Sequence, residues 1–534
     1  MQGGIEFALL VLLLLVCVPL VGSYMAKVFD KPSSAPGMGW SAYARAMLCF
    51  NGIGLLFLFV LQLLQGWLPL NPQGLPGVGP SLAFNTAISF VTNTNWQAYG
   101  GETTMSYLTQ TLGLGVQNFV SAATGNAILL ALIRGLRQER AETIGNFWID
   151  LSRMVIYVLL PLSILFAVVL ASQGVIQSAS PYIEAVTLEG EKQVIPMGMV
   201  ASQVAIKQLG TNGGGYFNAN SSHPFENPTP LTNFLELFAI LLIPTATTYM
   251  YGVMIGARRQ GIVLFIVMAV LWLAGVGLGE YFEASNVAAM EGKEVRLGVY
   301  DSVLWSASTT ATSNGSVNAM SDSLSPVAGG VSMFNMMIGE VVFGGVGVGL
   351  CGMLMFVLLT VFLSGLMVGR TPEYLGKKIE KREMQWTMLA LLAPAACILL
   401  GSAVAVSLPT ALASLTNAGP HGLSEMLYAF TSAAANNGSS FAGLNANTTF
   451  FNVTLGLIML LTRLAILIPS LAIAGSLAGK QKVAPTLGTF TTDTPLFASL
   501  LLCVIFIVAA LTFFPALSLG PIVEQLLMLK GRTF

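Results

Sequence analysis

Long apolar segments alternate with short polar ones along the whole chain. A run of about 20 apolar residues can cross the hydrocarbon core of a bilayer as a helix. The sequence contains ten such segments: 5–24, 45–66, 111–134, 148–172, 232–256, 262–282, 332–369, 385–408, 449–478 and 495–516. The seventh and ninth are too long for one straight helix, so we expect loops or extensions within them. The pattern predicts an all-α integral membrane protein with about ten transmembrane helices.

A short stretch rich in Asn, Thr, Ser and Gly interrupts the apolar pattern four times. These polar stretches are residues 92–95, 211–214, 313–316 and 436–439. Irregular backbone at membrane depth must line a cavity or be buried in protein, because hydrocarbon offers it no hydrogen-bond partner. Four such loops in one chain can close a ring around an axis, as they do in an ion selectivity filter.

A run of eleven to fourteen residues, beginning with serine, leads into each polar stretch. The four runs are Ser81 to Asn93, Ser202 to Asn212, Ser302 to Asn314 and Ser424 to Asn437. Serine is a favoured helix N-cap, and helices of this length are too short to cross the hydrocarbon core. We therefore expect four re-entrant pore helices, whose C-terminal partial negative charges point to where a cation would bind.

These patterns predict one membrane domain over residues 1–534, built from four pseudo-symmetric repeats of helix, pore helix, filter loop and helix. The expected repeats are residues 45–134, 148–256, 262–369 and 385–478. Segments 5–24 and 495–516 remain as extra helices.

The polar stretches have the composition of a carbonyl filter for a monovalent cation. Glycine at 213, 315 and 438 supplies the positive φ of a tight turn, and Asn95 is the next most tolerant type for that conformation. A single Asn-Gly pair is ordinary turn chemistry, but four polar stretches that each follow a similar run favour a filter. No carboxylate lies in the stretches, which argues against a divalent ion. The predicted filter comprises Asn93, Thr94, Asn95, Thr211, Asn212, Gly213, Ser313, Asn314, Gly315, Asn436, Asn437 and Gly438.

Composition agrees with a membrane protein. Charged residues make up 9% of the chain and the mean hydropathy is +0.76, whereas soluble domains carry about 25% charged residues. The net charge of −1 and the absence of a basic block give no indication of nucleic-acid binding. All five cysteines lie in apolar segments, so they predict neither a disulfide framework nor a zinc motif.

Lysine and arginine concentrate in the loops that follow odd-numbered segments, while residues 67–110 and 409–448 contain none. The positive-inside rule then places both termini and all four polar stretches outside. The basic loop residues Arg370, Lys377, Lys378, Lys381 and Arg382 fix this topology, and docking of a partner is a second possible role.

A second glycine-rich stretch, residues 339–349, lies inside the seventh segment and contains Glu340. A charge at the bilayer centre costs about 2.5–3.5 kcal/mol on insertion scales, so Glu340 should face a polar pathway. We interpret the stretch as a gate or tunnel element below the filter; close helix packing through small residues is the alternative. The residues of this predicted gate are Gly339, Glu340, Gly344, Gly345 and Gly347.

Other polar residues have less defined roles. Gln97 and Glu102 follow the first polar stretch and either shape the ion entrance or form a solvated rim. Arg463, within the ninth segment, must find an acidic or carbonyl partner. His223 and His421 are the only histidines and have no cluster of ligands near them in sequence, so we expect no metal site there.

The chain has no sign of an ATPase domain. The glycines at 344–349 do not form the GxxxxGK[ST] phosphate-binding motif and follow no strand. The predicted inner loops are also too short for a domain, which rarely has fewer than about 50 residues. We expect no ATP hydrolysis by this chain itself.

Along nearly its whole length the chain resembles the potassium-binding A subunit of the bacterial Kdp-type potassium-transporting ATPase. The resemblance rests on residues 92–97, 210–228, 339–347, 369–378, and 419–422 with 436–438. It implies a channel-like subunit of the inner (cytoplasmic) membrane, surrounded by lipid, that captures external K⁺ without a covalent cofactor. The family often has cysteine where this chain has Asn314, which leaves the affinity and the K⁺/Na⁺ selectivity open.

The resemblance also implies partners: a B subunit that hydrolyses ATP and receives K⁺ through an intramembrane tunnel, a C subunit and a small F subunit. On this interpretation the chain is a non-catalytic subunit of an ion translocase. The alternative is a stand-alone potassium channel or symporter, which would conduct without partners. A membrane-embedded enzyme would need grouped acid, base or metal ligands, which the sequence does not display.

Overall fold

The computed structural model describes residues 2–284, 290–339, 341–484 and 490–532. Within these ranges, ten helical spans are long and apolar enough to cross a membrane, as the sequence predicts. Their elements, in chain order, are α1 (Gln2–Phe29), α2 and η1 (Trp40–Leu64, Gln65–Trp67), η2 and α5 (Thr109–Gly115, Val116–Arg137), α6, η3 and α7 (Phe147–Arg153, Met154–Leu159, Leu160–Ser172), α9 (Pro230–Met254), α10 (Arg258–Ala284), α13 (Val348–Met367), α14 (Lys381–Val406), α17 (Thr449–Ala478), and α18, η6 and α19 (Pro495–Leu517, Ser518–Ile522, Val523–Met528).

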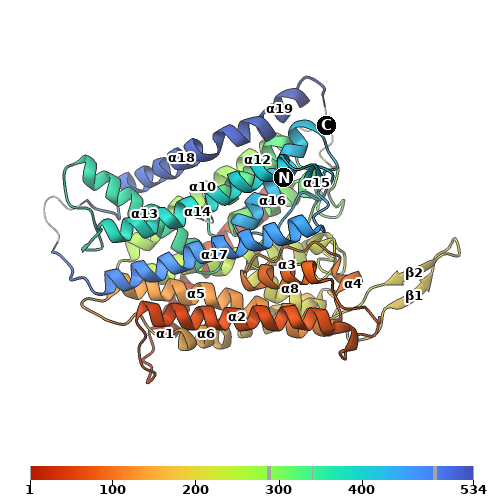
Figure 1. Ribbon diagram of the computed structural model, residues 1–534, viewed down its shortest axis with the longest axis horizontal. Helices are drawn as coiled ribbons and strands as arrows, with labels where there is room; N and C mark the ends of the chain where they lie inside the picture. The colour runs from red at the N-terminus through yellow and green to blue at the C-terminus, as the bar shows by residue number, and fades with distance from the viewer. Residues whose placement is uncertain (1, 285–289, 340, 485–489, 533–534) are drawn as a thin grey trace.

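Four short helices enter the bundle without crossing it, each between two spans. They are α3 (Pro80–Val91), α8 (Val200–Leu209), α11 (Gly298–Ala311) and α16 (Gly419–Ala434). Three of them, α3, α8 and α16, are labelled in Figure 1, in the half of the bundle where α1 begins and α19 ends. The order helix, pore helix, helix therefore occurs four times, which confirms the predicted fold class. The residues at which one repeat ends and the next begins stay predictions.

The spans divide into inner and outer helices. α5 and α9, which follow the first two pore helices, are buried along most of their length, and so is α13. The spans α1, α7 and α18 expose large apolar side chains such as Leu9, Leu165 and Leu511. Exposed leucine over a whole helix face is stable only against lipid. The inner helices thus surround the ends of the pore helices, and the outer ones face the bilayer.

The two overlong segments differ. The seventh divides into α12 (Pro326–Met337) and α13, separated by residues 338–347. The ninth contains no loop: α17 is one helix of 30 residues with Pro469 inside it. Of the two expected explanations, a loop or an extension, the ninth segment has the extension: a helix of that length spans about 45 Å and continues past the hydrocarbon core of about 30 Å.

The predicted serine N-caps are wrong. The pore helices begin before the serines, and none of their N-cap residues makes a side-chain capping hydrogen bond. Pro80 and Pro420 occupy the first positions of α3 and α16, where a missing N–H costs nothing. Three of the serines instead donate their hydroxyls back along the chain: Ser202 to Met199, Ser302 to Gly298 and Ser424 to Pro420.

Two small antiparallel hairpins and a few short helices complete the described chain. β1 (Ile183–Val186) pairs with β2 (Lys192–Ile195), with Ile183 opposite Ile195, and projects beyond the bundle (Figure 1). β3 (Glu373–Tyr374) pairs with β4 (Lys377–Lys378), between α13 and α14. The short helices are α4 (Gly101–Thr104), η4 (Asn220–Ser222), η5 (Ser321–Ser323) and α15 (Pro409–Leu412).

Candidate ion-binding site

Each pore helix ends one or two residues before its polar stretch. The last helical residues are Val91, Leu209, Ala311 and Ala434, and every residue of the four stretches is buried except Gly438, which is half-buried. The C-terminus of a helix carries about half a negative charge, spread over carbonyl groups that have no partner inside the helix. Four such ends directed at buried loops create a negative potential without any carboxylate.

The backbone of the four stretches follows one repeated conformation. Each contains two residues with positive φ, separated by one residue whose φ is not positive: Asn93 and Asn95, Thr211 and Gly213, Ser313 and Gly315, Asn436 and Gly438. The positive φ expected at the three glycines and at Asn95 is therefore present. Left-handed backbone at threonine or serine costs of order 1–3 kcal/mol, so it persists only where the surrounding structure enforces it. Because all four stretches have positive φ at the same two places, equivalent peptide groups are oriented alike in each stretch.

The four stretches pack against one another in chain order. A Cβ atom at Gly213 would overlap the carbonyl oxygen of Asn314, one at Gly315 that of Asn437, and one at Gly438 that of Thr94. The second stretch thus contacts the third, the third the fourth, and the fourth the first. Asn93 joins the first to the second through a 2.8 Å hydrogen bond from Nδ2 to the carbonyl oxygen of Thr211. The stretches therefore form a closed ring.

Asparagine side chains hold this ring together from outside. Asn314 Nδ2 donates to the carbonyl oxygen of Lys207 at 3.2 Å, and its Oδ1 accepts from the Ser316 amide at 3.0 Å. Asn437 makes the same two bonds one repeat later. Its Nδ2 donates to the carbonyl oxygen of Thr309 at 2.9 Å, and its Oδ1 accepts from the Ser439 amide at 3.1 Å. Since these side chains bond to the protein, the backbone carbonyls are the groups left to bind an ion.

A buried ion pair supports the second stretch. Lys207, in the last turn of α8, lies 2.5 Å from Glu226 and 2.8 Å from Oδ1 of Asn220, and both ionic side chains are fully buried. The carbonyl oxygen of Lys207 accepts the amide of Asn212 at 2.8 Å. The sequence patterns described above assign no role to Lys207. A lysine inside an apolar pore-helix run was the available signal, because such a residue must find a buried acid.

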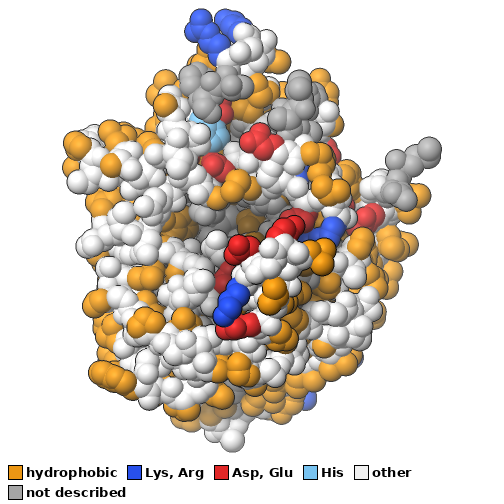
Figure 2. Space-filling view, turned by 90° about the vertical axis from the view of Figure 1, so that its right-hand side faces the viewer, with side chains coloured by type: hydrophobic (Ala, Val, Ile, Leu, Met, Phe, Trp, Pro, Cys, Tyr) orange, Lys and Arg blue, Asp and Glu red, His pale blue; other side chains and the backbone are white. Residues whose placement is uncertain are grey.

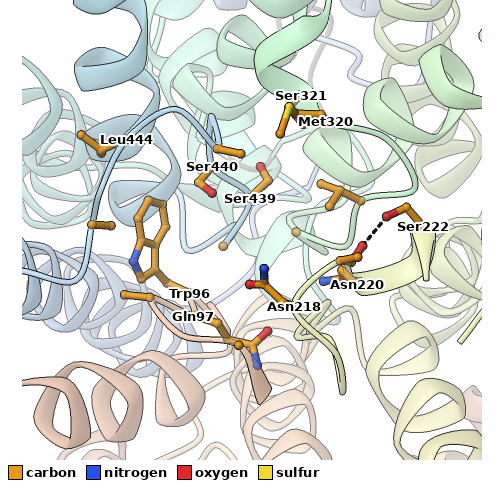
Figure 3. Close-up of a pocket in the computed structure, with 18 of the residues that line it drawn as sticks. Trp96, Gln97, Asn218, Asn220, Ser222, Met320, Ser321, Ser439, Ser440 and Leu444 are labelled. Carbon is orange, nitrogen blue, oxygen red and sulfur yellow. Dashed lines mark hydrogen bonds between the residues drawn. The ribbon is translucent and has the colours of Figure 1, made fainter. Parts of the chain in front are cut away.

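Above the ring the protein is hollow. A cavity of about 720 Å³ is lined by the ends of the polar stretches and by residues that follow them, among them Trp96, Gln97, Asn218 and Ser440 (Figure 3). Figure 2 looks onto this end of the molecule and shows a hollow with both acidic and basic side chains beside it and apolar side chains at the periphery. The cavity lining itself includes one residue of each sign, Lys293 and Glu294. We call this cavity the vestibule.

The two predicted entrance residues are placed differently. Gln97 lines the vestibule, and its side-chain amide bonds both backbone groups of Gly215, at 3.0 Å and 2.8 Å. Glu102 does not line the vestibule; its carboxylate accepts the amide of Asn218 at 2.8 Å. Gln97 thus links the end of the first stretch to the backbone just after the second, and Glu102 holds the loop that contains Asn218.

The glycine-rich segment between α12 and α13 lies directly beneath the ring. The Val346 amide donates to Oγ1 of Thr211 at 3.0 Å. Gly339 and Gly347 have φ of +77° and +82°, and a Cβ atom at Gly347 would overlap the backbone of Asn126 in α5. Gly345 accepts the amide of Gly349 at 3.0 Å, and Gly344 packs against that glycine. Glu340 lies outside the described residues.

A narrow cavity of about 70 Å³ runs from the ring to this segment, lined by Asn436, Thr462 and Gly339. It continues between α14 and α18, beside Leu391 and Val508. Arg463 is buried in α17, with its guanidinium close to Gly125 of α5. This cavity therefore extends from the ring sideways, toward the outer helices.

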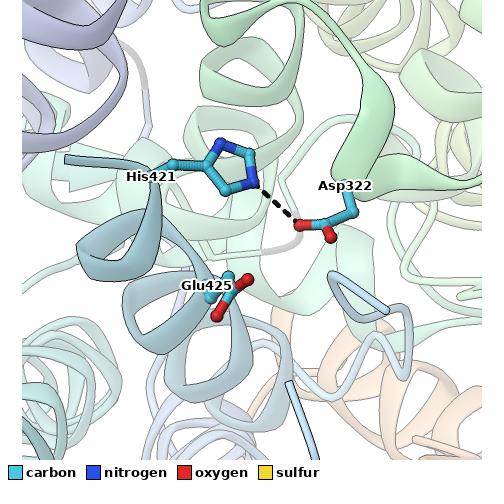
Figure 4. Close-up of side chains that lie close together, drawn as sticks. All are labelled: Asp322, His421 and Glu425. Atoms are coloured by element: carbon cyan, nitrogen blue, oxygen red, sulfur yellow. Dashed lines mark hydrogen bonds and ion pairs between the residues drawn. The ribbon is translucent and has the colours of Figure 1, made fainter. Parts of the chain in front are cut away.

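Two further expectations need correction. Lys377 is buried and donates to the carbonyl oxygens of Gly135, Gln138 and Leu477, so its amine is not a free docking group. His421, expected to lack a ligand cluster, lies beside Asp322 and Glu425 (Figure 4). Burial alone would lower the pKa of His421, but its hydrogen bonds with Asp322 and Glu524 raise it to about 10.

Comparisons of the sequence and of the fold both relate this chain to potassium-transport proteins. The family model of the potassium-transporting ATPase A subunit matches residues 8–526. The chain is 52% identical, over 100% of its length and 99% of the relative's, to the potassium-transporting ATPase potassium-binding subunit of Rhodospirillum centenum. It is 55% identical to that of Mesorhizobium japonicum, over 93% of this chain and 89% of the relative. The potassium transporter TrkH from Vibrio parahaemolyticus has a similar fold, with a TM-score of 0.55 and 14% identity over 87% of this chain and 97% of that one.

Proposed function

Because this chain belongs to the family of potassium-transporting ATPase A subunits, we propose that it captures external K⁺ in the ring of four polar stretches. The ion then passes to a separate ATP-hydrolysing subunit through the membrane. The relatives from Rhodospirillum centenum and Mesorhizobium japonicum are named potassium-binding subunits. The site residues on this proposal are the twelve filter residues predicted from the sequence.

The observation that carries the proposal is the closed ring with alternating φ. A dehydrated K⁺ ion loses its water ligands, and a ring of carbonyl oxygens replaces them. Thr94, Asn212, Asn314 and Asn437 occupy equivalent places between the positive-φ residues, so their carbonyls form one level of ligands. Pore-helix C-termini add a negative potential that favours a monovalent cation in a site without carboxylates.

The gate on this proposal comprises Gly339, Glu340, Gly344, Gly345 and Gly347. The position of residues 341–347 beneath the ring, and the hydrogen bond between Val346 and Thr211, support a block to straight passage. The lateral cavity beside α14 and α18 supports a sideways exit. An exit within the membrane requires a partner that covers it, because an open polar path facing lipid would leave an ion unsolvated.

The partners and location follow from the family. We propose a B subunit that binds and hydrolyses ATP, with C and small F subunits, in the inner membrane of a bacterium. Both termini and the vestibule face outside on this proposal, since the described loops at the opposite end hold basic residues such as Arg140, Arg259 and Lys480.

Rubidium flux into liposomes that contain this chain alone tests the proposal. We expect no passive flux under an inward gradient, and uptake only when the ATP-hydrolysing partner and ATP are added. Robust flux through the chain alone would instead establish a stand-alone channel or symporter. In the complex, Gly213→Asp should abolish high-affinity uptake while the protein still inserts, and unchanged affinity in that variant would contradict the filter assignment.

A further inference from the structure

A cluster of three potential metal ligands lies at the outer end of the fourth pore helix. His421 and Glu425 are one turn apart on α16 and share a face, and Asp322 comes from η5, after the third polar stretch. One ligand atom from each of the three lies within 4.8 Å of the others (Figure 4), and His421 Nε2 is 3.1 Å from Asp322 Oδ1. None of the three lines the vestibule cavity.

The carboxylate of Glu425 is incompletely satisfied. Its Oε1 accepts hydrogen bonds from Thr416 at 3.1 Å and Asn417 at 2.7 Å. Its Oε2 is buried and has no hydrogen-bond partner among the described residues, on a side chain that is 0% exposed. A buried carboxylate oxygen without a donor is costly. A cation bound between Glu425, Asp322 and His421 would satisfy it.

The second ring nitrogen of His421, Nδ1, already has a hydrogen-bond partner. It lies 2.7 Å from Oε1 of Glu524, in α19. Metal-binding histidines commonly donate this second N–H to a carboxylate, which fixes the ring orientation and makes the ligating nitrogen more basic. Three carboxylates therefore surround one imidazole, and this excess of acidic groups favours a bound cation. The cation would replace the proton shared between Nε2 and Asp322.

We propose that Asp322, His421 and Glu425 form a binding site for a transition-metal dication of the Zn²⁺ type. Zinc accepts mixed nitrogen and oxygen ligands at about 2.0–2.2 Å in a tetrahedron, which separates ligand atoms by roughly 3.4 Å. The pair of His421 Nε2 and Asp322 Oδ1, 3.1 Å apart, is already at about that spacing, and all three ligand atoms lie within 4.8 Å of one another. Calcium and magnesium prefer six or more oxygen ligands, and an imidazole ligand favours the transition metals.

The site would join three parts of the chain that are distant in sequence. Asp322 follows the third polar stretch, His421 and Glu425 begin the fourth pore helix, and Glu524 lies near the C-terminus. Asp322 and His421 are 11% and 13% exposed, so an ion from solution has access. Because only the folded chain presents all three ligands together, binding stabilises the folded state in proportion to ion concentration.

Cobalt and zinc titration of the purified full chain in detergent tests the proposal. We expect one equivalent of Co²⁺ to give the visible absorption of a tetrahedral site, and Zn²⁺ to displace it and raise the melting temperature. His421→Gln should weaken binding at least tenfold, and so should the isosteric Glu425→Gln. His223→Gln, which removes the other histidine, is the matched control and should bind as the natural chain does.

Two results would overturn the proposal: no saturable binding to the natural chain, or His421→Gln binding with unchanged affinity and spectrum. Size-exclusion profiles and melting curves without metal identify any variant that fails to fold. Since Glu425→Gln keeps the shape of the side chain, it separates loss of a ligand from loss of structure. The rubidium-flux result does not depend on this site, so the two proposals fail independently.

Discussion

At the scale of single residues, the ring depends on backbone conformation more than on side-chain chemistry. Eight residues in the four polar stretches have positive φ, and four of them are asparagine, threonine or serine at equivalent first places. The other four residues with positive φ are three glycines and Asn95. A positive φ at a residue other than glycine costs free energy and persists only where the surrounding structure enforces it. Side chains such as Asn93 and Asn314 hold that arrangement by bonding the neighbouring repeat.

Gly213→Ala should weaken K⁺ binding in the assembled transporter by about tenfold or more, that is about 1.4 kcal/mol or more. The added methyl group would overlap the carbonyl oxygen of Asn314 and displace a ligand. Gly256→Ala is the matched control, because Gly256 has φ of +74° against +76° for Gly213 but has nothing within 4 Å. Both variants carry the same backbone strain. Equal losses of affinity in an uptake assay would contradict the filter.

Asn314→Cys should keep K⁺ affinity within about threefold, less than 0.7 kcal/mol, because the carbonyl and not the side chain is the proposed ligand. It should lower the free energy of unfolding by about 1–2 kcal/mol, through loss of the bonds to Lys207 and Ser316. Rubidium uptake checks the predicted affinity, and melting curves check the predicted loss of stability. Asn437→Cys is the matched variant, since Asn437 makes the same two contacts one repeat later. A large loss of affinity in Asn314→Cys alone would place that side chain in the ion site.

At the scale of elements, the pore helices are fixed at their C-terminal ends. Their N-termini lack side-chain caps, whereas the C-terminal turn of α8 contains the buried pair of Lys207 and Glu226. The carbonyl oxygen of Lys207 receives hydrogen bonds from both the second and the third stretch, through Asn212 and Asn314. The position of this helix end therefore sets the geometry of two adjacent loops.

Lys207→Met should destabilise the chain by about 3–5 kcal/mol, because it leaves the carboxylate of Glu226 buried without its partner. The melting temperature and K⁺ uptake should both fall. The double variant Lys207→Met with Glu226→Gln removes the unpaired charge and should recover part of the melting temperature. A double variant no more stable than the single one would show that the pair is not the source of the loss.

At the scale of the whole molecule, buried inner helices separate the ring from lipid, and the segment between α12 and α13 lies beneath the ring. Val341, Val342 and Phe343 are buried in that segment. Small glycines on either side, Gly339 and Gly347, permit the tight turns that fold it back under the ring. On the proposed function these apolar side chains form the gate, because a hydrophobic constriction closes an ion pathway by excluding water.

Simultaneous replacement of Val341, Val342 and Phe343 by alanine should open a passive route. Liposomes with the variant alone should then take up rubidium, while those with the natural chain should not. The control replaces three lipid-facing residues, Leu9, Leu12 and Leu15, by alanine and should leave the membrane tight. Absence of flux through a correctly folded gate variant would show that the block lies elsewhere.

The sequence by itself determined the number of spans, the four polar stretches and the sites of positive φ at glycine. Each of these depends on local chemistry: the length of an apolar run against the bilayer thickness, or the freedom of a residue without a Cβ atom. The N-terminal ends of the pore helices were misplaced because serine hydroxyls can bond back to the helix as readily as they cap it.

Only the tertiary structure decided which distant residues meet. The order of the ring, the pairing of Lys207 with Glu226, and the approach of Asp322 to His421 join positions far apart in the chain. Local patterns carry no such information, because a helix face or a loop can bond any complementary group that packing brings near it. Tertiary packing placed the stretches against one another, and it also brought Asp322 and Glu524 to a histidine whose nearby carboxylate in the sequence is Glu425, one helical turn away.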